Sequence, residues 1–299
     1  MMTPRKKRQF DILLADDGSE HARAAVALLG DLPLPSESLI TVFRAFASTQ
    51  AAEVEAIEDA VKRTCALLIN KGLQAKYEVL LGAPAEKIVE YAEEHKPDLI
   101  AIGAKGLRAT LGILLGGVAQ QVVEYACCPV LVVRAPYTKL QRILLVSDGS
   151  PYSDEAVKYL GGFPLPDGVS VDVMHVLPPP PFPLVVSEPA YSGMAIVEPL
   201  PVPEEVAALR LREEELGQKL LDCTVKELKK YSLAATSVLK RGDAATEIIE
   251  YAKKQEIDLI VTGSRGLSQF RSWLMGSVSR KLVHYSGCSV LVVRGPQAG

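Results

Sequence analysis

DLIVTGSRGLSQFRSWLMGSVSRKLVHYSGCSVLVVR, residues 258–294, contains the pattern that decides the fold. It opens with an apolar run, continues through a glycine-rich connection and closes on a second apolar run at residues 289–293. Short apolar runs bounded by turn residues are typical of strands that are covered on both faces. The segment therefore predicts a strand, a loop, a helix and a strand, which is the repeating unit of a parallel α/β sheet.

The same pattern occurs earlier in the chain, which is an internal repeat. Residues 87–134 and 247–294 are identical at 21 of 48 positions without a gap, far beyond chance for unrelated segments. The repeat starts earlier still, because DILLADDGS at residues 11–19 matches RILLVSDGS at residues 142–150. A chain of 299 residues also suits two domains of roughly 150 residues each.

We expect copy one to span residues 1–137 and copy two to span residues 138–299. In copy two the expected strands are 143–146, 169–176, 235–239, 258–262 and 289–293, and the expected helices are 156–160, 204–231, 244–254 and one that begins near Gly276. Strands that alternate with helices in this way form βαβ units with right-handed crossovers, which place helices on both faces of the sheet.

Composition argues against several classes of protein. The net charge of −3 gives no reason to expect nucleic-acid binding, and the basic cluster at residues 5–8 is interpreted as a solvated tail. No apolar run approaches the roughly 20 residues that cross a bilayer, and no signal peptide is visible. Five scattered cysteines fit reduced thiols better than a disulfide framework. We therefore expect a cytoplasmic protein that binds no membrane.

Copy two carries a glycine pattern suited to phosphate. Gly263 and Gly266 follow the strand, and Gly276-Ser277 open the next helix, with the spacing G-x2-G-x9-G-S. Glycines let backbone N–H groups approach phosphate oxygens without obstruction by a Cβ atom. A helix that starts at Gly276 presents unpaired N–H groups and a partial positive charge to an anion. The Ser277 hydroxyl can add a hydrogen bond to phosphate or ligate Mg²⁺.

Asp148 follows the first strand of copy two. Ligands of open parallel sheets bind beyond the carboxyl ends of the strands, where the strand order reverses. If the first and fourth strands are neighbours there, Asp148 and Gly263 flank one crevice, and the carboxylate can accept hydrogen bonds from ribose hydroxyls. The residue type is equally suited to an Asx-turn or to the N-cap of the next helix, and the sequence leaves both interpretations open.

Three segments of copy two resemble the universal stress protein family: ILLVSDGSPYSDEA, VDVMHV and residues 258–293. The resemblance covers essentially the whole chain as a tandem pair, and the glycine spacing is that of the family's ATP-binding branch. It implies a Rossmann-like five-stranded parallel α/β sheet of order 3-2-1-4-5 in each copy. It also implies adenine-nucleotide binding, with ATP, AMP or ADP as the ligand and Mg²⁺ accompanying ATP. The implied site residues are Asp148 near the ribose, the Val176 backbone at the adenine, and Gly263, Ser264, Arg265, Gly266, Gly276, Ser277 and Val278 around the ribose and phosphates.

Copy one departs from this pattern. Its matching positions are Asp17, Gly103, Gly106, Gly116 and Gly117, and Arg44 is expected where copy two has Val176. Gly117 lacks the hydroxyl of Ser277. Losing one hydrogen bond to a charged group costs about 1.5–3 kcal/mol, or roughly ten- to a hundred-fold in affinity. We therefore expect copy one to be a degenerate site that binds ATP more weakly than copy two.

No catalytic constellation is evident. The four histidines fall in no metal-ligand or nucleophile spacing, and no Walker lysine follows the glycine loop. An efficient ATPase would need a positioned water and a residue to orient it. We expect a nucleotide-binding regulatory protein, or stress sensor, with slow hydrolysis at most.

Three alternative functions are to be compared with the sequence. An enzyme of the related adenine-nucleotide α-hydrolase class would show S-G-G-x-D-S after the first strand, where this chain has Ser147-Asp148-Gly149-Ser150. A pair of phospho-receiver domains would place an aspartate where the fourth strand of copy one ends in Gly103. The third alternative is an interaction module that binds no nucleotide, which copy one can be even if copy two is not.

The last strand of each copy predicts how the copies associate. Residues 129–133 and 289–293 are strongly apolar, and such a strand at a sheet edge invites pairing with another edge. The family resemblance implies a dimer contact at this edge, so we expect a pseudo-dimer within the chain and allow for a homodimer of chains. The proline-rich stretch at residues 178–203 is expected to be an irregular surface loop, either a connector or a cover over a ligand site.

Overall fold

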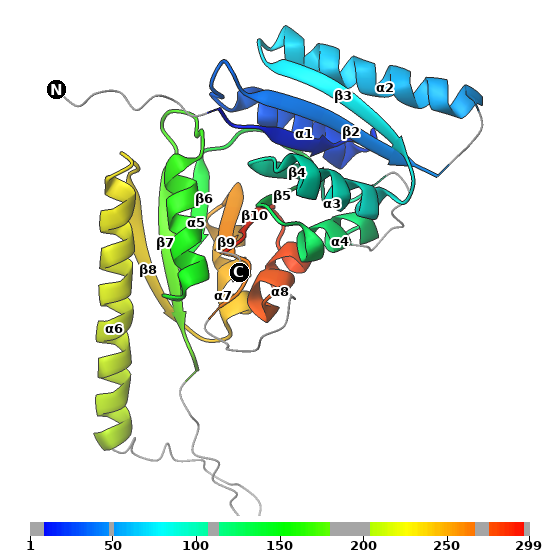
Figure 1. Cartoon of the computed structure of the whole chain (residues 1–299). Helices are drawn as coiled ribbons and strands as arrows, with labels where there is room; N and C mark the ends of the chain where they lie inside the picture. Colours follow the sequence, from blue (N-terminus) through cyan, green and yellow to red (C-terminus); the bar gives the residue numbers. More distant parts are fainter. Residues whose placement is uncertain (1–8, 48–50, 107–113, 180–203, 267–274, 296–299) are drawn as a thin grey trace, which may run out of the picture.

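The computed structural model describes residues 9–47, 51–106, 114–179, 204–266 and 275–295. Within these ranges, one sheet of ten strands runs through both copies, with helices on both faces (Figure 1). Most of the proline-rich stretch, which we expected to be an irregular surface loop, and the middle of the copy-two glycine loop lie outside the described residues.

Each copy alternates strands and helices in the expected order. Copy one consists of β1 (Ile12–Ala15), α1 (Glu20–Asp31), β2 (Leu39–Phe46), α2 (Ala51–Asn70), β3 (Gln74–Leu81), α3 (Pro84–His95), β4 (Leu99–Gly103), α4 (Gly117–Tyr125) and β5 (Val130–Val133). Copy two consists of β6 (Arg142–Val146), α5 (Pro151–Gly162), β7 (Ser170–Leu177), α6 (Glu204–Lys229), β8 (Ala235–Arg241), α7 (Ala244–Lys254), β9 (Leu259–Gly263), α8 (Ser277–Tyr285) and β10 (Ser289–Val293).

The strand order of the sheet is β3-β2-β1-β4-β5-β10-β9-β6-β7-β8. Strands within each copy are parallel, and each half therefore has the predicted order 3-2-1-4-5. The two halves meet where β5 and β10 pair antiparallel, with Leu131 opposite Leu291. The predicted α/β fold class is confirmed, and the apolar edge strands of the two copies cover one another.

Equivalent serines start the first helix of each copy. The Ser19 hydroxyl accepts a hydrogen bond from the Ala22 amide at 3.1 Å, and the Ser150 hydroxyl accepts one from the Ser153 amide at 3.2 Å. Such N-caps satisfy amides that a helix leaves unpaired at its start. They fix the point at which the chain turns from the carboxyl ends of β1 and β6 into α1 and α5.

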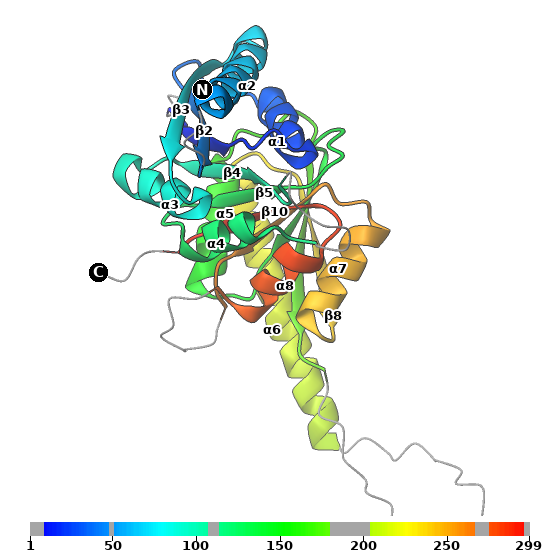
Figure 2. The same ribbon diagram turned by 90° about the vertical axis from the view of Figure 1, so that its right-hand side faces the viewer.

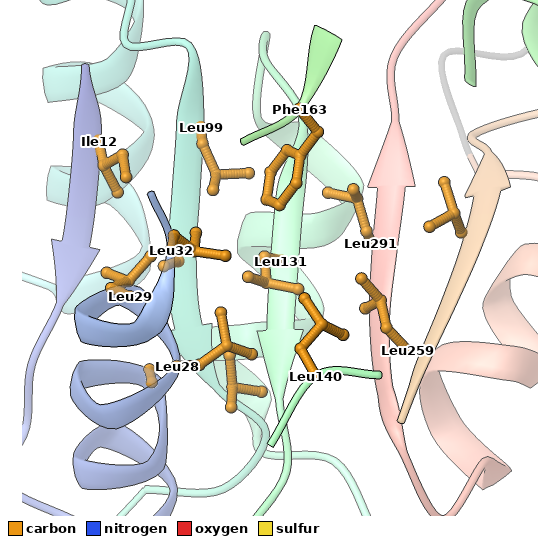
Figure 3. Packing of buried hydrophobic residues seen from close by; sticks show 14 of the residues in the cluster. Ile12, Leu28, Leu29, Leu32, Leu99, Leu131, Leu140, Phe163, Leu259 and Leu291 are labelled. Atoms are coloured by element: carbon orange, nitrogen blue, oxygen red, sulfur yellow. The ribbon is translucent and has the colours of Figure 1, made fainter. Parts of the chain in front are cut away.

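Two apolar clusters form the core, one on each face of the sheet. The first packs α1, α2, α5 and α6 on the sheet, and the second packs α3, α4, α7 and α8 on the other face. Both clusters contain residues from both copies. Leu131 and Leu291 lie together in the first cluster, beside Leu140 and Leu259 (Figure 3). The core is thus continuous across the junction of the two copies.

One residue correspondence drawn from the sequence is wrong. Arg44 was expected at the position of Val176, but the strand register places it at the position of His175. Ile40 of β2 pairs with Ile12, and Val171 of β7 pairs with Ile143, which is the residue of β6 equivalent to Ile12. Arg44 and His175 each lie four residues after these paired residues, so they are equivalent to each other. The Val176 position in copy one is taken by the alanine that follows Arg44.

The longest helix, α6, lies at the outer edge of copy two and extends beyond the end of β8 in both views (Figures 1 and 2). Arg241 at the end of β8 holds it, because its Nη1 lies 2.7 Å from Oε2 of Glu213. None of the helices in the described ranges has the length and apolar character required to cross a membrane.

Candidate functional site

A cavity of about 240 Å³ lies at the carboxyl ends of β6, β7 and β9 in copy two. The first turns of α5, α7 and α8 supply the rest of its walls. β6 lies between β7 and β9, where the strand order reverses and ligands of open α/β sheets bind. The volume is close to the roughly 300 Å³ at which small-molecule sites begin.

Asp148 uses its two carboxylate oxygens differently. Oδ1 accepts a hydrogen bond from the Ser150 amide at 3.0 Å, which is an Asx-turn at the start of α5. Oδ2 lies against Gly266, where a Cβ atom on the glycine would approach it to 2.6 Å. The structural role considered for Asp148 is therefore real, and it leaves the second oxygen facing the glycine loop at the cavity.

The glycines of the loop bring backbone close to this carboxylate. A side chain at Gly266 would collide with Asp148, and a Cβ on Gly276 would come within 3.3 Å of the Arg265 Cα. The Gly276 amide donates to the Ser264 carbonyl at 2.8 Å, which closes the loop on itself just before α8. Only residues without a side chain fit these two positions without displacing their neighbours.

The N-terminus of α8 points its unpaired amides at the cavity. Its N-cap is Gly276, which has no side chain to satisfy them, and Ser277 and Val278 of its first turn line the cavity. An uncapped helix N-terminus favours a bound anion through its free N–H groups and the helix dipole.

Hydroxyl groups fasten α8 to the end of β9. Ser279 is buried, and its Oγ donates to the Gly263 carbonyl at 2.7 Å. The Thr262 hydroxyl lies 3.5 Å from the Ser279 hydroxyl and 3.2 Å from the same carbonyl. These bonds fix the height of the first turn of α8 above the sheet, which sets where its free amides lie.

Gly263 has a packing role. A Cβ at this position would lie 2.7 Å from the backbone of Tyr152, so the glycine permits α5 to approach β9 closely. Arg265 is also held in place by this tyrosine. Its Nη1 lies 3.1 Å from the Tyr152 hydroxyl, and its guanidinium lies 5.5 Å from the centre of the ring. Arg265 is therefore a positioned cation at the cavity wall.

The other end of the cavity is more apolar. Val176 of β7 lies there with Ala244 and Ile248 of α7. His175 also lines the cavity, but its side chain points to the other face of β7, next to α6. The His175 Nδ1 lies 2.8 Å from the Ser147 carbonyl. Because a carbonyl can only accept, this bond requires a proton on Nδ1.

The structure brings most of the predicted copy-two residues together. Asp148 and Ser277 line the same cavity, as do Val176, Gly263, Arg265, Gly266, Gly276 and Val278. Ser264 does not line it; it is buried, and its carbonyl closes the loop instead. These placements leave the binding role of each residue a prediction.

Sequence reasoning missed a set of hydroxyl groups around the cavity. Ser147, Ser153, Thr262 and Ser279 all line it. The equivalent residues of copy one have no hydroxyl, and they are Asp16, Ala22, Ile102 and Ala119. The signal was available from a position-by-position comparison of the copies outside the glycine motif.

Copy one keeps the backbone arrangement but changes its surroundings. Asp17 Oδ1 accepts from the Ser19 amide at 3.0 Å, and a Cβ on Gly106 would lie 2.6 Å from Asp17 Oδ2. These contacts repeat those of Asp148 and Gly266. Gly116 is an uncapped start of α4, as Gly276 is of α8. The two copies thus differ chiefly in side chains, so one can serve as the control for the other.

Metal-ligating residues do not gather at this cavity. Among the described residues, no three or more histidines, cysteines, aspartates or glutamates are grouped so that they could hold a metal ion. Ser277, the predicted Mg²⁺ ligand, therefore has no carboxylate or imidazole cluster beside it within that part of the chain.

Comparison with known proteins agrees with this architecture. The sequence profile of the Universal stress protein family matches the chain twice, at residues 10–134 and 139–294. The chain belongs to the universal stress protein family. It is thus a tandem member of a family of stress-response proteins.

Two sequence relatives of this universal stress protein each match about half of it. Universal stress protein YxiE of Bacillus subtilis is 29% identical over 51% of this chain and 98% of its own length. A universal stress protein of Methanocaldococcus jannaschii is 43% identical over 56% of this chain and 89% of its own length. Among solved structures, a universal stress protein of Archaeoglobus fulgidus is similar over 97% of both chains, with a TM-score of 0.64 at 20% identity. The last likeness concerns the fold alone.

Proposed function

We propose that copy two of this universal stress protein binds an adenine nucleotide, with ATP as the preferred ligand, and that the protein is a nucleotide-responsive regulator. The observation that supports this most is the convergence of Asp148, the Gly266 backbone and the uncapped start of α8 on one cavity. A carboxylate and a set of free amides at a strand-order reversal match the two polar parts of a nucleotide, the ribose and the phosphates.

Each wall of the cavity suits a different part of the ligand. Asp148 Oδ2 is an acceptor for ribose hydroxyls, and the first-turn amides of α8 with the Ser277 hydroxyl are donors for phosphate oxygens. Arg265, held by Tyr152, adds a positive charge beside them. The apolar end near Val176 and Ile248 suits a base.

The glycines at positions 266 and 276 also leave the space that the ligand needs. A Cβ atom at Gly266 would fill the space against Asp148 that the ribose side needs, and one at Gly276 would press on the loop. Mg²⁺ would enter with the phosphates, since oxygen ligands from nucleotide and water are its usual partners, and the Ser277 hydroxyl is the proposed protein ligand.

Binding, with little or no turnover, is the proposed activity. The cavity lining contains Asp148 and His175 as its acid–base groups. The first is engaged in an Asx-turn, and the second donates its ring proton to the Ser147 carbonyl. An efficient ATPase needs a residue that orients the attacking water, and in the proposed complex Asp148 Oδ2 is engaged by the ribose. We propose that the protein responds to whether its nucleotide site is occupied.

Isothermal titration of the full chain with Mg²⁺–ATP tests the proposal. Ser277→Ala removes one hydrogen bond to a charged group, so we expect ATP binding to weaken roughly ten- to a hundred-fold. The matched control is Gly117→Ser, which adds a hydroxyl at the equivalent position of copy one and should leave the tight binding event unchanged.

Two results would count against the proposal. If the parent chain shows no binding of ATP, ADP or AMP, the cavity is not a nucleotide site. If Ser277→Ala binds ATP as the parent does, the start of α8 is not where the phosphates lie.

A further inference from the structure

The strands β5 and β10 each end in an arginine that reaches into the other copy. Arg134 follows β5, and its Nη2 donates to the Val283 carbonyl at 2.8 Å and to the His284 carbonyl at 3.1 Å. Arg294 follows β10 and donates to the Val123 carbonyl. These acceptors lie in the last turns of α8 and α4, where a helix leaves its carbonyls unpaired. The two arginines thus cap helices of opposite copies.

Arg134 makes one further contact that reaches the glycine loop of its own copy. Its Nη1 donates to the Leu114 carbonyl at 2.8 Å, and Leu114 lies two residues before Gly116 in the copy-one loop. Burial lowers the pKa of Arg134, but arginine remains charged at any physiological pH. One half-buried guanidinium therefore joins Leu114 of copy one to the C-terminus of α8.

A second link reaches the other end of α8. Arg280, one turn after Gly276, lies with its Nε 3.5 Å from Oε1 of Glu124 on α4. Its Nη2 lies 3.5 Å from the carbonyl of Met275, the residue before Gly276. Glu124 is largely buried, with 15% of its side chain exposed. The copy-one carboxylate therefore orients a side chain that contacts the copy-two loop.

The second link exists in one direction only. The positions equivalent to Arg280 and Glu124 in the opposite copies are Gln120 and His284, which form no comparable ion pair. A symmetric arrangement would place the same ion pair in both copies. This one connects α4 of copy one to the first turn of α8, the helix at the proposed nucleotide site.

We propose that Arg134 and Glu124 of copy one are positioning residues for the copy-two site: they hold α8 at both ends and thereby set the affinity of its first turn for phosphate. This inference rests on the nucleotide-binding function proposed above. It gives copy one a role at the copy-two site, because Arg134 bonds both to Leu114 of copy one and to the last turn of α8. Substitutions along such contact networks change coupling enough to alter affinity roughly 2- to 30-fold.

The test measures Mg²⁺–ATP affinity by titration of the full-length Arg134→Gln and Glu124→Gln variants. Neither residue lines the cavity, and we expect both variants to bind ATP about 2- to 30-fold more weakly than the parent. Tyr137→Phe is the control, because it removes the bond from the Tyr137 hydroxyl to Asp31 at 3.0 Å and packs on the opposite face of the sheet. It should leave ATP affinity unchanged.

A double-mutant cycle adds a readout that loss of stability alone would not change. If Glu124 acts through Arg280, the effects of Glu124→Gln and Arg280→Gln on ATP affinity will be non-additive. Additive effects, or affinities of Arg134→Gln and Glu124→Gln equal to that of the parent while Ser277→Ala weakens binding, would overturn the inference and leave the proposed function intact.

Hydrogen exchange of the nucleotide-free chain separates the two proposals further. We expect the amides of residues 275–285 to exchange faster in Arg134→Gln than in the parent or in Tyr137→Phe, because α8 opens locally more often. Unchanged exchange there would overturn the inference whether or not the parent binds ATP. If the parent binds no nucleotide, it is the proposed function that fails.

Discussion

Asp148 combines a structural and a proposed binding role in one carboxylate. Oδ1 is fixed by the Ser150 amide, which leaves Oδ2 in one place against Gly266. A group that is already held loses little conformational freedom when it binds a ligand. The Asx-turn would thus hold Asp148 ready for the proposed contact with ribose, and the two interpretations of the residue are compatible.

Asp148→Asn should separate these roles. The amide oxygen can keep the Asx-turn with Ser150, so the free energy of unfolding should stay close to that of the parent. The amide nitrogen then faces the cavity, where it cannot accept from ribose hydroxyls, and titration should show ATP binding about ten- to a hundred-fold weaker. Asp17→Asn is the control in copy one. Unimpaired ATP binding by Asp148→Asn would show that this carboxylate does not contact the ligand.

The sequence predicted individual site residues where the backbone demanded a particular type. Gly266 and Gly276 have a steric reason that spacing alone could suggest. The hydroxyls of Thr262 and Ser279 could not be assigned in this way, because serine and threonine are common everywhere and their bonds depend on how α8 packs on β9. The Arg44 correspondence failed because β2 and β7 share few residues, so their alignment is fixed only by their pairing with β1 and β6.

At the scale of elements, the best predicted were those with clear end signals. The helix at Ala244–Lys254 and the strand at Ser289–Val293 have the expected bounds. Strand β9 begins one residue later than expected and includes Gly263, since a glycine can extend a strand as readily as end it. The links from copy one to α8 could not be predicted, because they join residues about 150 positions apart.

The helix α7, which forms the apolar wall of the cavity, depends on its N-cap. Asp243 accepts from the Thr246 amide at 3.0 Å and from its hydroxyl at 2.8 Å. These hydrogen bonds with Thr246, together with the nearby charge of Lys281, lower the pKa of Asp243 from its ordinary value of 3.8. The ionised carboxylate is thus the form that caps the helix.

Asp243→Ala should lower the free energy of unfolding by about 0.5–2 kcal/mol at neutral pH. Because the folded-state pKa is lowered, the cap stabilises the protein above pH 3.8 and loses this effect as the pH falls through the folded value. Urea unfolding at neutral and acidic pH should show the difference from the parent shrinking with acidity. A difference independent of pH would contradict an ionic cap. Asp243→Asn, a neutral cap, is the control.

At the scale of the whole molecule, the two copies form one structural unit. The sheet passes from β5 to β10 without a break, and each of the two apolar clusters draws residues from both copies. The sequence repeat predicted two similar halves, and the apolar edge strands predicted their pairing. The sequence also predicted that the copies differ at Gly117 and Ser277. What the pattern could not predict is how the further hydroxyls of copy two bond, because this depends on how α8 packs on β9.

The most direct test of the account is therefore a comparison of one substitution in both copies. Gly266→Ala and Gly106→Ala each place a Cβ atom 2.6 Å from an aspartate Oδ2, that of Asp148 in one case and that of Asp17 in the other. Isothermal titration with Mg²⁺–ATP should show at least about ten-fold weaker binding for Gly266→Ala and parent-like binding for Gly106→Ala. If Gly106→Ala loses ATP while Gly266→Ala binds it as the parent does, the nucleotide site is in copy one and the central claim is wrong.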